Sequence, residues 1–252
     1  MRKVIIITDC IDVALLEMRG AIYSNTTKTD FVIEPIVKVD EYSIINTAFL
    51  LDLIVNAYPD GSIVSVVVNP VQKRTERIIA KLHMKNIIIE GTNTGAFGRV
   101  LEKYGCDELY EIHDNGFVPF GGKFVHAPTV GKVLSGKSLA EIGSVFDINR
   151  VRTTPNNSGL VLHKDNFGNI KFIGDLGNAM NGDQYEITVS GENCVAIYWE
   201  RMMECDDKQI VIYPGSSFGF PEIGIVRGDF ASKYNVHVGD VIYQEKKENP
   251  YE

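Results

Sequence analysis

Residues 62–69, Ser-Ile-Val-Ser-Val-Val-Val-Asn, are the most β-rich run in the chain. Its β-branched residues lie close together, which is typical of a strand covered on both faces. The segment before it, Ile44–Tyr58, has the apolar spacing of an amphipathic helix and ends at Pro59-Asp60-Gly61. A helix followed by a buried strand is typical of a parallel sheet with helices outside it.

The same alternation extends outward through the first 150 residues. Further strands are predicted at Val4–Thr8, Phe31–Val39 and Asn86–Glu90, and further helices at Val13–Ser24, Ala96–Tyr104, Pro128–Leu134 and Leu139–Ile142. Repeated β-α-β order predicts an α/β domain built on a mainly parallel sheet.

The composition changes near residue 150. Arg150–Gly159 is polar, contains Pro and Asn-Asn, and is typical of a linker. Short β runs with glycine-rich turns between them follow, and this spacing predicts a small antiparallel sandwich or barrel. We therefore expect two domains, residues 1–150 and 151–252. The β runs are Leu160–His163, Ile170–Ile173, Gln184–Val189, Cys194–Trp199, Gln209–Tyr213, Ile223–Arg227 and Val241–Gln244.

Composition and charge exclude several classes of protein. The 252 residues are 44% hydrophobic, which is too apolar for a disordered chain. A net charge of −8 argues against a nucleic-acid partner, because such proteins present a basic face. No apolar run approaches the roughly 18–20 residues that span a bilayer, and the N-terminus lacks the apolar stretch of a secretory signal. We expect a cytoplasmic protein that does not bind membranes.

Metal ligands are not grouped in the sequence. The four cysteines, at positions 10, 106, 194 and 205, form no CxxC pair, and the five histidines form no HxxxH spacing. Zinc sites use such close pairs, so we expect no metal and interpret the cysteines as free thiols.

Two polar residues follow predicted parallel strands. Asp9 lies at the carboxyl end of the first strand, where open α/β sheets bind ligands and where a carboxylate commonly accepts from a ribose diol. The alternative is that Asp9 caps the following helix. Asn69 ends the central strand because Pro70 removes a donor, and its amide can orient a water or hold a ligand oxygen. The charged cluster after it, 73–77, is typical of a solvated loop.

Other segments also have a functional and a structural interpretation. Thr92–Gly95 indicates a helix N-terminus, which either meets an anion or is simply capped. Phe120–Phe124 is predicted as a glycine-bearing turn. In the second half, Asp165–Asn169 is predicted as a polar turn, and Ser216–Pro221 combines hydroxyls with aromatic rings, which suits a flat heterocycle such as adenine or an exposed hairpin turn.

The order of these segments resembles the S-adenosylmethionine hydroxide adenosyltransferases and the related fluorinating and chlorinating enzymes. Met18–Ile22 is similar to the family's Met-Lys-Gly-Val-Ile, and Val66–Pro70 to its Val-Val-Asp-Pro. Phe120–Pro128 resembles Phe-His-Gly-Arg-Asp-x-Phe-Ala-Pro, and Asp165–Asn169 resembles Asp-Arg-Phe-Gly-Asn. Ser217–Val226 resembles the closing Ser-x-Gly-x-x-Glu-Ile-Ala-Val.

The resemblance implies a Rossmann-like N-terminal domain, a C-terminal β-barrel domain and a homotrimer. Its ligand, S-adenosylmethionine, lies between the first domain of one subunit and the second domain of a neighbour. By resemblance, Asp9 holds the ribose, while Asp165, Asn169 and Ser217 contact the ligand. The rings of Phe167 and Phe218 are expected to be walls for adenine.

The chain departs from the family where water is activated. Hydroxide-transferring members use an Asp, an Arg and a His, whose positions correspond here to Asn69, to the neighbourhood of Glu76 with Arg74 and Arg77, and to Gly121. Losing a general base costs about 10²–10⁴-fold in rate, so Asn69 is left as the catalytic candidate of a slow or altered reaction.

The resemblance therefore predicts an adenosyltransferase-like enzyme that uses water as nucleophile and gives adenosine and L-methionine. Two alternatives remain: a non-catalytic protein that binds S-adenosylmethionine or another nucleoside, and an S-adenosylmethionine lyase of specialised metabolism.

Overall fold

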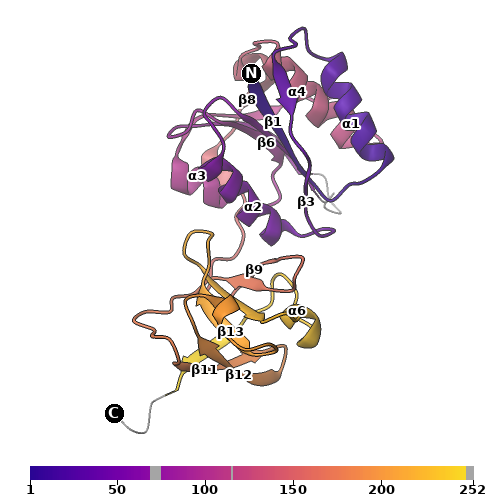
Figure 1. Ribbon diagram of the computed structural model, residues 1–252. Coiled ribbons are helices and arrows are strands. Elements are labelled where there is room, and N and C mark those ends of the chain that lie inside the picture. Colours follow the sequence, from indigo (N-terminus) through magenta and orange to yellow (C-terminus); the bar gives the residue numbers. More distant parts are fainter. Residues whose placement is uncertain (69–74, 115, 248–252) are drawn as a thin grey trace. The chain divides into compact units, whose positions relative to one another are not determined.

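A computed structural model describes residues 1–68, 75–114 and 116–247, and divides the chain into two units, Met1–Thr154 and Pro155–Glu252. Each unit contains one sheet, so the fold is a mixed α/β fold with two sheets (Figure 1). We describe the units one at a time.

The N-terminal unit is built on a sheet in the order β2-β1-β4-β6-β5-β7-β8, with β3 also beside β1. The first four strands of this order are parallel, whereas β5, β7 and β8 join antiparallel. The expectation of a mainly parallel sheet therefore holds only for its first half. The strands are β1 (Arg2–Thr8), β2 (Phe31–Ile33), β3 (Val37–Lys38), β4 (Ile63–Val67), β5 (Arg77–Leu82), β6 (Ile88–Thr92), β7 (Cys106–Ile112) and β8 (Gly143–Val145).

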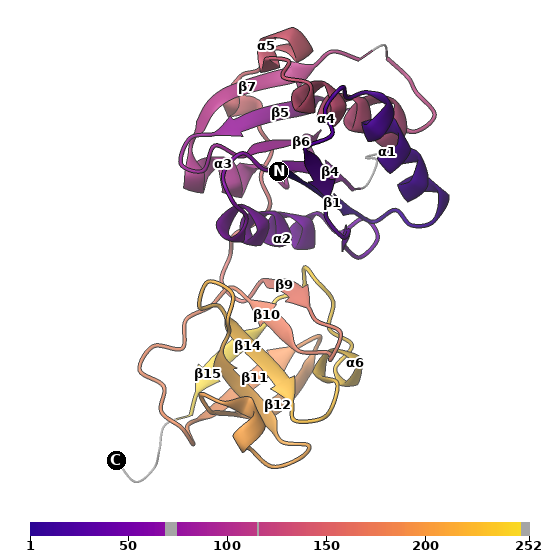
Figure 2. The same cartoon turned by 45° about the horizontal axis from the view of Figure 1, so that its top comes forward.

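Helices cover both faces of this sheet (Figures 1 and 2). On one face, Ile5 and Ile7 of β1 belong to a core with Leu51 of α2. On the other face, Val4 of β1 belongs to a core with Met18 of α1. Alternate strand residues thus enter two cores, which explains the continuous apolar runs in the sequence. The helices are α1 (Val13–Ser24), α2 (Ile44–Ala57), α3 (Gly98–Tyr104), a π-helical turn η1 (Gly122–His126), α4 (Ala127–Leu134), α5 (Leu139–Ile142) and a 3-10 turn η2 (Ile148–Arg150).

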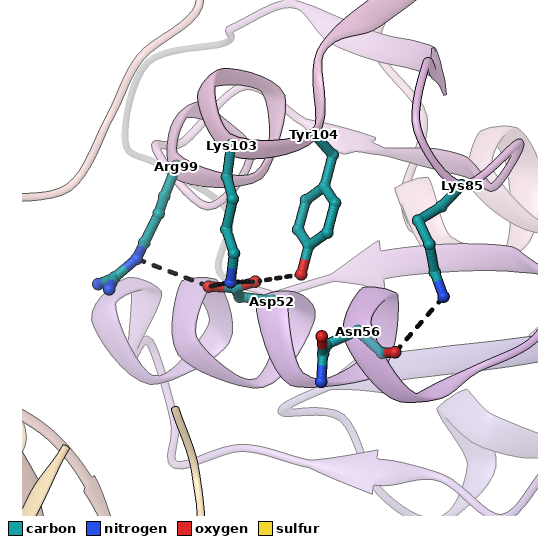
Figure 3. A network of polar contacts seen from close by, with 6 residues as sticks. All are labelled: Asp52, Asn56, Lys85, Arg99, Lys103 and Tyr104. Atoms are coloured by element: carbon teal, nitrogen blue, oxygen red, sulfur yellow. Dashed lines mark hydrogen bonds and ion pairs between the residues drawn. The ribbon is translucent and has the colours of Figure 1, made fainter. Parts of the chain in front are cut away.

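A buried carboxylate joins α2 to α3 (Figure 3). Asp52, whose side chain is 2% exposed, accepts hydrogen bonds from Lys103 Nζ at 2.9 Å and from the Tyr104 hydroxyl at 2.9 Å. Arg99 Nε lies 3.7 Å from the same carboxylate. Burial, together with Asp52, raises the pKa of Tyr104, so its hydroxyl remains a donor. The network fixes α3 on α2 beside the sheet.

The C-terminal unit is a curled sheet in the order β15-β11-β12-β13-β14-β10-β9. Its two ends meet, because Leu160 before β9 forms a bridge with Val241 before β15. All pairs are antiparallel except β12–β13, which is parallel and differs from the antiparallel expectation. The elements are β9 (Val161–Lys164), β10 (Ile170–Phe172), β11 (Gln184–Val189), β12 (Glu192–Tyr198), η3 (Met202–Glu204), β13 (Ile210–Pro214), β14 (Pro221–Ile225), α6 (Phe230–Lys233) and β15 (Tyr243–Lys246).

The closure of this sheet requires a glycine at position 159. Gly159 accepts a hydrogen bond from the Ile242 amide at 2.9 Å and donates one to the Ile173 carbonyl at 2.6 Å. It has a φ of +82°, and a Cβ atom there would lie 2.1 Å from the Ile242 carbonyl oxygen. Glycine is the residue that tolerates both this backbone angle and this close approach.

Among the described helices, none combines the length and the apolarity that crossing a bilayer requires.

Candidate functional site

The carboxyl ends of β1 and β4 lie side by side in the N-terminal unit. Thr8 and Val67 are paired in the parallel ladder, and Thr8 Oγ1 donates to the Val67 carbonyl at 2.7 Å. Asp9 follows directly and its Oδ2 accepts from the Tyr42 amide at 3.1 Å. The capping alternative is not observed, because the residue before α1 is Asp12 and no side chain caps that helix. Asp9 therefore lies at the edge where α/β sheets bind ligands.

Two expectations at this edge meet different outcomes. Asn69 lies outside the described residues, so its role stays a prediction. Thr92–Gly95 is not a helix N-terminus: Thr92 ends β6 and α3 begins at Gly98 without a side-chain cap. The Asn93 side chain instead accepts from the Arg152 amide at 2.9 Å and donates to the Arg150 carbonyl at 3.0 Å. Asn93 thus holds the chain that leaves the unit.

The charged cluster at 73–77 is partly inside the structure, where Arg77 begins β5 rather than a solvated loop. Its guanidinium forms an ion pair with Asp114, and both side chains are largely buried. A Cβ atom on Gly121 would lie 3.1 Å from Arg77 Nη2. Arg77 and Gly121, two positions that the resemblance singles out, are therefore adjacent here, and the second offers no side chain.

Glu76 has a structural role instead. It pairs with Arg150 at 2.5 Å and accepts from Thr75 Oγ1 at 2.8 Å. Its own backbone N–H, followed by Thr75, Arg150 and Asn93, lowers the pKa of Glu76 to about 2. Among the described residues of this cluster, Arg77 is the arginine that faces Gly121.

The predicted glycine turn at Phe120–Phe124 is instead helical. Gly122–His126 form one π-helical turn that continues into α4, and Gly121 precedes it with helical angles. Position 122 favours glycine, because a Cβ atom there would lie only 2.7 Å from Met18 Sδ. Single π-helical turns inserted in helices occur often at functional sites.

The last residue of this turn belongs to a buried polar cluster that sequence reasoning missed. His126 Nδ1 lies 2.7 Å from Glu90 Oε2, and the Ser65 hydroxyl donates to Glu90 Oε1. Glu90 is 0% exposed and His126 is 3% exposed. The one feature of the sequence that could have indicated this cluster is Glu90, a charged residue at the end of the apolar run that begins at Ile87.

In the C-terminal unit, Asp165–Asn169 forms the predicted polar turn between β9 and β10. Asp165 Oδ1 accepts from the amides of Phe167 and Asn169, both at 2.9 Å, and Oδ2 accepts from Asn169 Nδ2 at 3.0 Å. The Phe167 ring is 68% exposed. Asp165 therefore shapes the turn, and the turn presents an exposed ring.

Ser217 and Phe218 lie in the hairpin between β13 and β14. The Ser217 carbonyl accepts from the Phe220 amide at 3.1 Å, and Phe218 adopts a φ of +58°. The rings of Phe218 and Phe220 meet edge to face at 6.2 Å. Ser217 and Phe218 are half-buried in this tight hairpin.

The two loops do not lie together but at opposite ends of β14. Ile170, next to Asn169, pairs with Ile223, whereas the Ser217 hairpin closes at the Pro214–Pro221 pair. At about 3.3 Å per residue, these two pairs lie roughly 7 Å apart along β14. The roles of the Phe167 and Phe218 rings as walls for adenine stay a prediction. A ligand that touches both loops must be elongated along β14.

A buried network lies beneath the strip of surface along β14 that runs from the Asp165–Asn169 turn to the Ser217 hairpin. Glu222 of β14 pairs with Lys171 of β10 and accepts from the Tyr213 hydroxyl at 3.1 Å. Burial raises the pKa of Tyr213, and the carboxylates of Glu222 and Asp165 raise it further. The network joins β10, β13 and β14 beneath the two loops.

The thiols offer little reactivity. All four cysteines are free and partly buried. Burial raises the pKa of Cys10, the thiol beside Asp9, so it stays protonated near neutral pH. Within the described ranges, no group of three or more His, Cys, Asp or Glu side chains is placed to hold a metal ion.

Comparisons with solved structures support the fold. An uncharacterised conserved protein from Thermotoga maritima is 19% identical, with a TM-score of 0.81 over 96% of this chain and 100% of that one. A conserved hypothetical protein from Thermus thermophilus is 18% identical, with a TM-score of 0.77 over 97% of this chain and 100% of that one. A search of curated proteins found no match.

Family models identify the relationship. The SAM hydroxide adenosyltransferase N-terminal domain matches residues 4–143, and the C-terminal domain of the same family matches residues 159–243. Both domains are present, in order, and together they span nearly all of the sequence. The chain belongs to the SAM hydroxide adenosyltransferase family.

Proposed function

We propose that the protein binds S-adenosylmethionine and transfers its adenosyl group, at the 5′ carbon, from the sulfonium sulfur to a hydroxylic nucleophile, with water giving adenosine and L-methionine. The observation that carries this proposal is the match to both domains of the family in one chain. The leaving methionine is neutral, so positioning and desolvation of the nucleophile supply much of the rate, on the order of 7–11 kcal/mol in favourable cases.

As the family resemblance implies, both units contribute residues that contact the ligand. Asp9 at the β1 edge binds the ribose diol. The strip along β14 suits an elongated ligand, with Phe167, Asp165 and Asn169 toward adenine and Ser217 with Phe218 toward the methionine part. S-adenosylmethionine has this shape, with an aromatic base at one end and an amino acid at the other.

A second candidate, a binding protein without catalysis, is favoured by one observation. Arg77 is paired with Asp114, and Gly121 beside it carries no side chain to hold a water. Incubating the purified protein with S-adenosylmethionine and identifying the products by mass spectrometry separates the two. Adenosine with methionine supports the enzyme, binding in calorimetry without products supports the binding protein, and methylthioadenosine with a lactone identifies a lyase. No binding and no product contradict all three.

Asp9→Ala is expected to weaken S-adenosylmethionine binding roughly 10- to 150-fold, because a hydrogen bond to a charged group contributes about 1.5–3 kcal/mol. Isothermal titration calorimetry measures this loss. Asp30→Ala, which removes an exposed carboxylate of the same unit, is the matched control and should bind as the parent protein does. Equal affinity of Asp9→Ala and the parent would remove Asp9 from the site.

We further propose that the ligand lies between the N-terminal unit of one copy and the C-terminal unit of a neighbour in a homotrimer, as the family resemblance implies. Mixing Asp9→Ala with Ser217→Ala protein after mild dissociation is then expected to recover intact sites. Each hybrid trimer contains at least one interface between an intact first unit and an intact second unit. Recovered binding in the mixture supports a shared site; a mixture no better than its components, or a monomer by light scattering, contradicts it.

A further inference from the structure

The Ser65–Glu90–His126 cluster places a titratable pair under the π-helical turn. Ser65 and Glu90 are direct neighbours on the parallel strands β4 and β6, and His126 ends the turn η1 above them. The carboxylate receives Ser65 Oγ–H on one oxygen and faces His126 Nδ1 at 2.7 Å on the other. Both oxygens of a fully buried carboxylate are therefore satisfied.

Stability alone does not account for this cluster. In the family motif that Phe120–Pro128 resembles, a Phe stands at the position of His126. Replacing both partners of a buried polar pair by apolar side chains of similar volume is often neutral or stabilising. Burying the polar Glu90–His126 pair costs desolvation free energy at a position where an aromatic ring packs well in the resembled family. This cost indicates that the pair has a role beyond packing.

The pair has the geometry of an oriented base. A carboxylate that holds Nδ1–H fixes the imidazole tautomer and leaves the Nε2 lone pair as the proton acceptor. Among the described residues, no group forms a hydrogen bond with His126 Nε2. His126 is 3% exposed, and Nε2 is the ring nitrogen left to take a proton from the nucleophile.

His126 lies on the same side of the sheet as Arg77. In the antiparallel ladder, Glu90 faces Ile79 and Thr92 faces Arg77, so Glu90 and Arg77 project from one face about 7 Å apart along the strands. Gly121, beside the Arg77 guanidinium, is one π-helical turn before His126. The π-helical turn η1 therefore links Gly121, which stands at the His position of the resembled family, to His126 of this chain.

We propose that His126, held by Glu90, accepts the proton of the hydroxylic nucleophile in this protein, because Asn69 and Gly121 stand where the resembled family has an Asp and a His. This inference rests on the proposed adenosyl transfer. The water oxygen forms a bond to the 5′ carbon, the carbon–sulfur bond breaks, and its electron pair leaves on methionine. The proton passes to His126 Nε2 through one intervening water, and Glu90 stabilises the resulting imidazolium.

Other charges near the turn are already paired or lie outside the cluster. Glu17 of α1 binds Lys123 at 2.7 Å, and Arg77 of β5 binds Asp114. The charged groups on the elements that pack against η1 are Glu17 and Arg19 of α1 and Lys132 of α4; β4 carries none, and Glu90 lies on β6.

The test measures adenosine formation against pH for the parent protein and for His126→Gln, with His113→Gln as the control for an exposed histidine of the same unit. The parent is expected to show a kcat that rises with pH along a single-proton limb. His126→Gln is expected to lose about 10²-fold or more in kcat, to keep KM within about threefold, and to lose the limb. His113→Gln should change neither.

Each result decides. A folded His126→Gln that keeps the parent's kcat and its pH limb overturns the inference and leaves the proposed function standing. If the parent protein forms no adenosine, the proposed function is contradicted, and the proposed role of His126 as a base is contradicted with it. If His126→Gln does not fold, the double variant Glu90→Leu/His126→Phe removes the charge together with its partner; it should fold and still lack the limb. A double variant with parental kcat is equally damaging to the proposal.

Discussion

Asp52→Ala is expected to lower the free energy of unfolding of the N-terminal unit by roughly 2–4 kcal/mol. The substitution removes the acceptor of the buried Tyr104 hydroxyl and the partner of Lys103 and Arg99. The phenol stays buried without a partner, whereas both cations can turn toward solvent, so the loss is smaller than that for a fully enclosed ion pair. Alanine is the better helix former, which offsets a few tenths of a kcal/mol.

Hydrogen exchange read by mass spectrometry locates this loss, since amides of α2 and α3 should exchange faster. Asp52→Asn keeps an acceptor for the Tyr104 hydroxyl, so its free energy of unfolding is expected to fall by less than that of Asp52→Ala. Glu108→Ala, which breaks a half-exposed pair with Lys81 at 3.9 Å, serves as the control and should change stability by less than about 0.5 kcal/mol. Equal losses for Asp52→Ala and Glu108→Ala would show that the network contributes nothing.

Gly159→Ala is expected to destabilise the C-terminal unit by at least about 3 kcal/mol. The left-handed backbone at φ +82° costs alanine about 1–2 kcal/mol by itself. The added Cβ also meets the backbone oxygen of Ile242 at 2.1 Å, and relieving that clash breaks the hydrogen bonds that close the sheet. Backbone cannot swing aside as a flexible side chain does.

Gly191→Ala isolates the two contributions, because Gly191 has a similar φ of +79° but nothing within 4 Å of the position that a Cβ atom would occupy. We expect it to show only the backbone cost. Urea unfolding followed by the fluorescence of Trp199, which lies in the same unit, measures both variants. If the two variants lose equal stability, the close approach to Ile242 is irrelevant.

The sequence predicted best those elements whose residues enter a core on both faces. The runs Val4–Thr8 and Ser62–Asn69 were predicted as buried strands and correspond to β1 and β4, because nearly every side chain in such a strand is apolar. Helices with a one-sided apolar stripe, such as Val13–Ser24, were also predicted with the observed bounds.

Strands with charged side chains were missed. Arg77–Leu82 begins with a cation that the fold neutralises by Asp114, a residue far along the chain, and local patterns do not reveal such a partner. The same reason explains why the Glu90–His126 pair was missed: 36 positions separate the two residues, and their pairing depends on how the π-helical turn packs on the sheet.

The candidate site was predicted unevenly. The place of Asp9 at a sheet edge was predicted, because strand ends at one sheet edge are a local feature of β-α-β order, and its contact with a ligand stays a prediction. The loops around Asp165 and Ser217 were recognised as polar turns, but their placement at opposite ends of β14 depends on antiparallel strand order, which the sequence does not encode locally. The glycines at 121 and 122 were predicted as a turn because glycine favours turns. In the structure they lie in a helical segment, where the lack of a side chain leaves room for Arg77 and Met18.

The ends of the two sheets have a consequence for how copies of this chain associate. Unpaired strand edges are the usual template for adding a foreign strand and for aggregation. The N-terminal sheet ends in two strands of three residues each, β2 and β8, and the C-terminal sheet joins its own margins at Leu160 and Val241. Within the described residues, little strand edge is therefore left for strand addition, and we expect copies of this chain to associate through side-chain surfaces and not through a continuous intermolecular sheet.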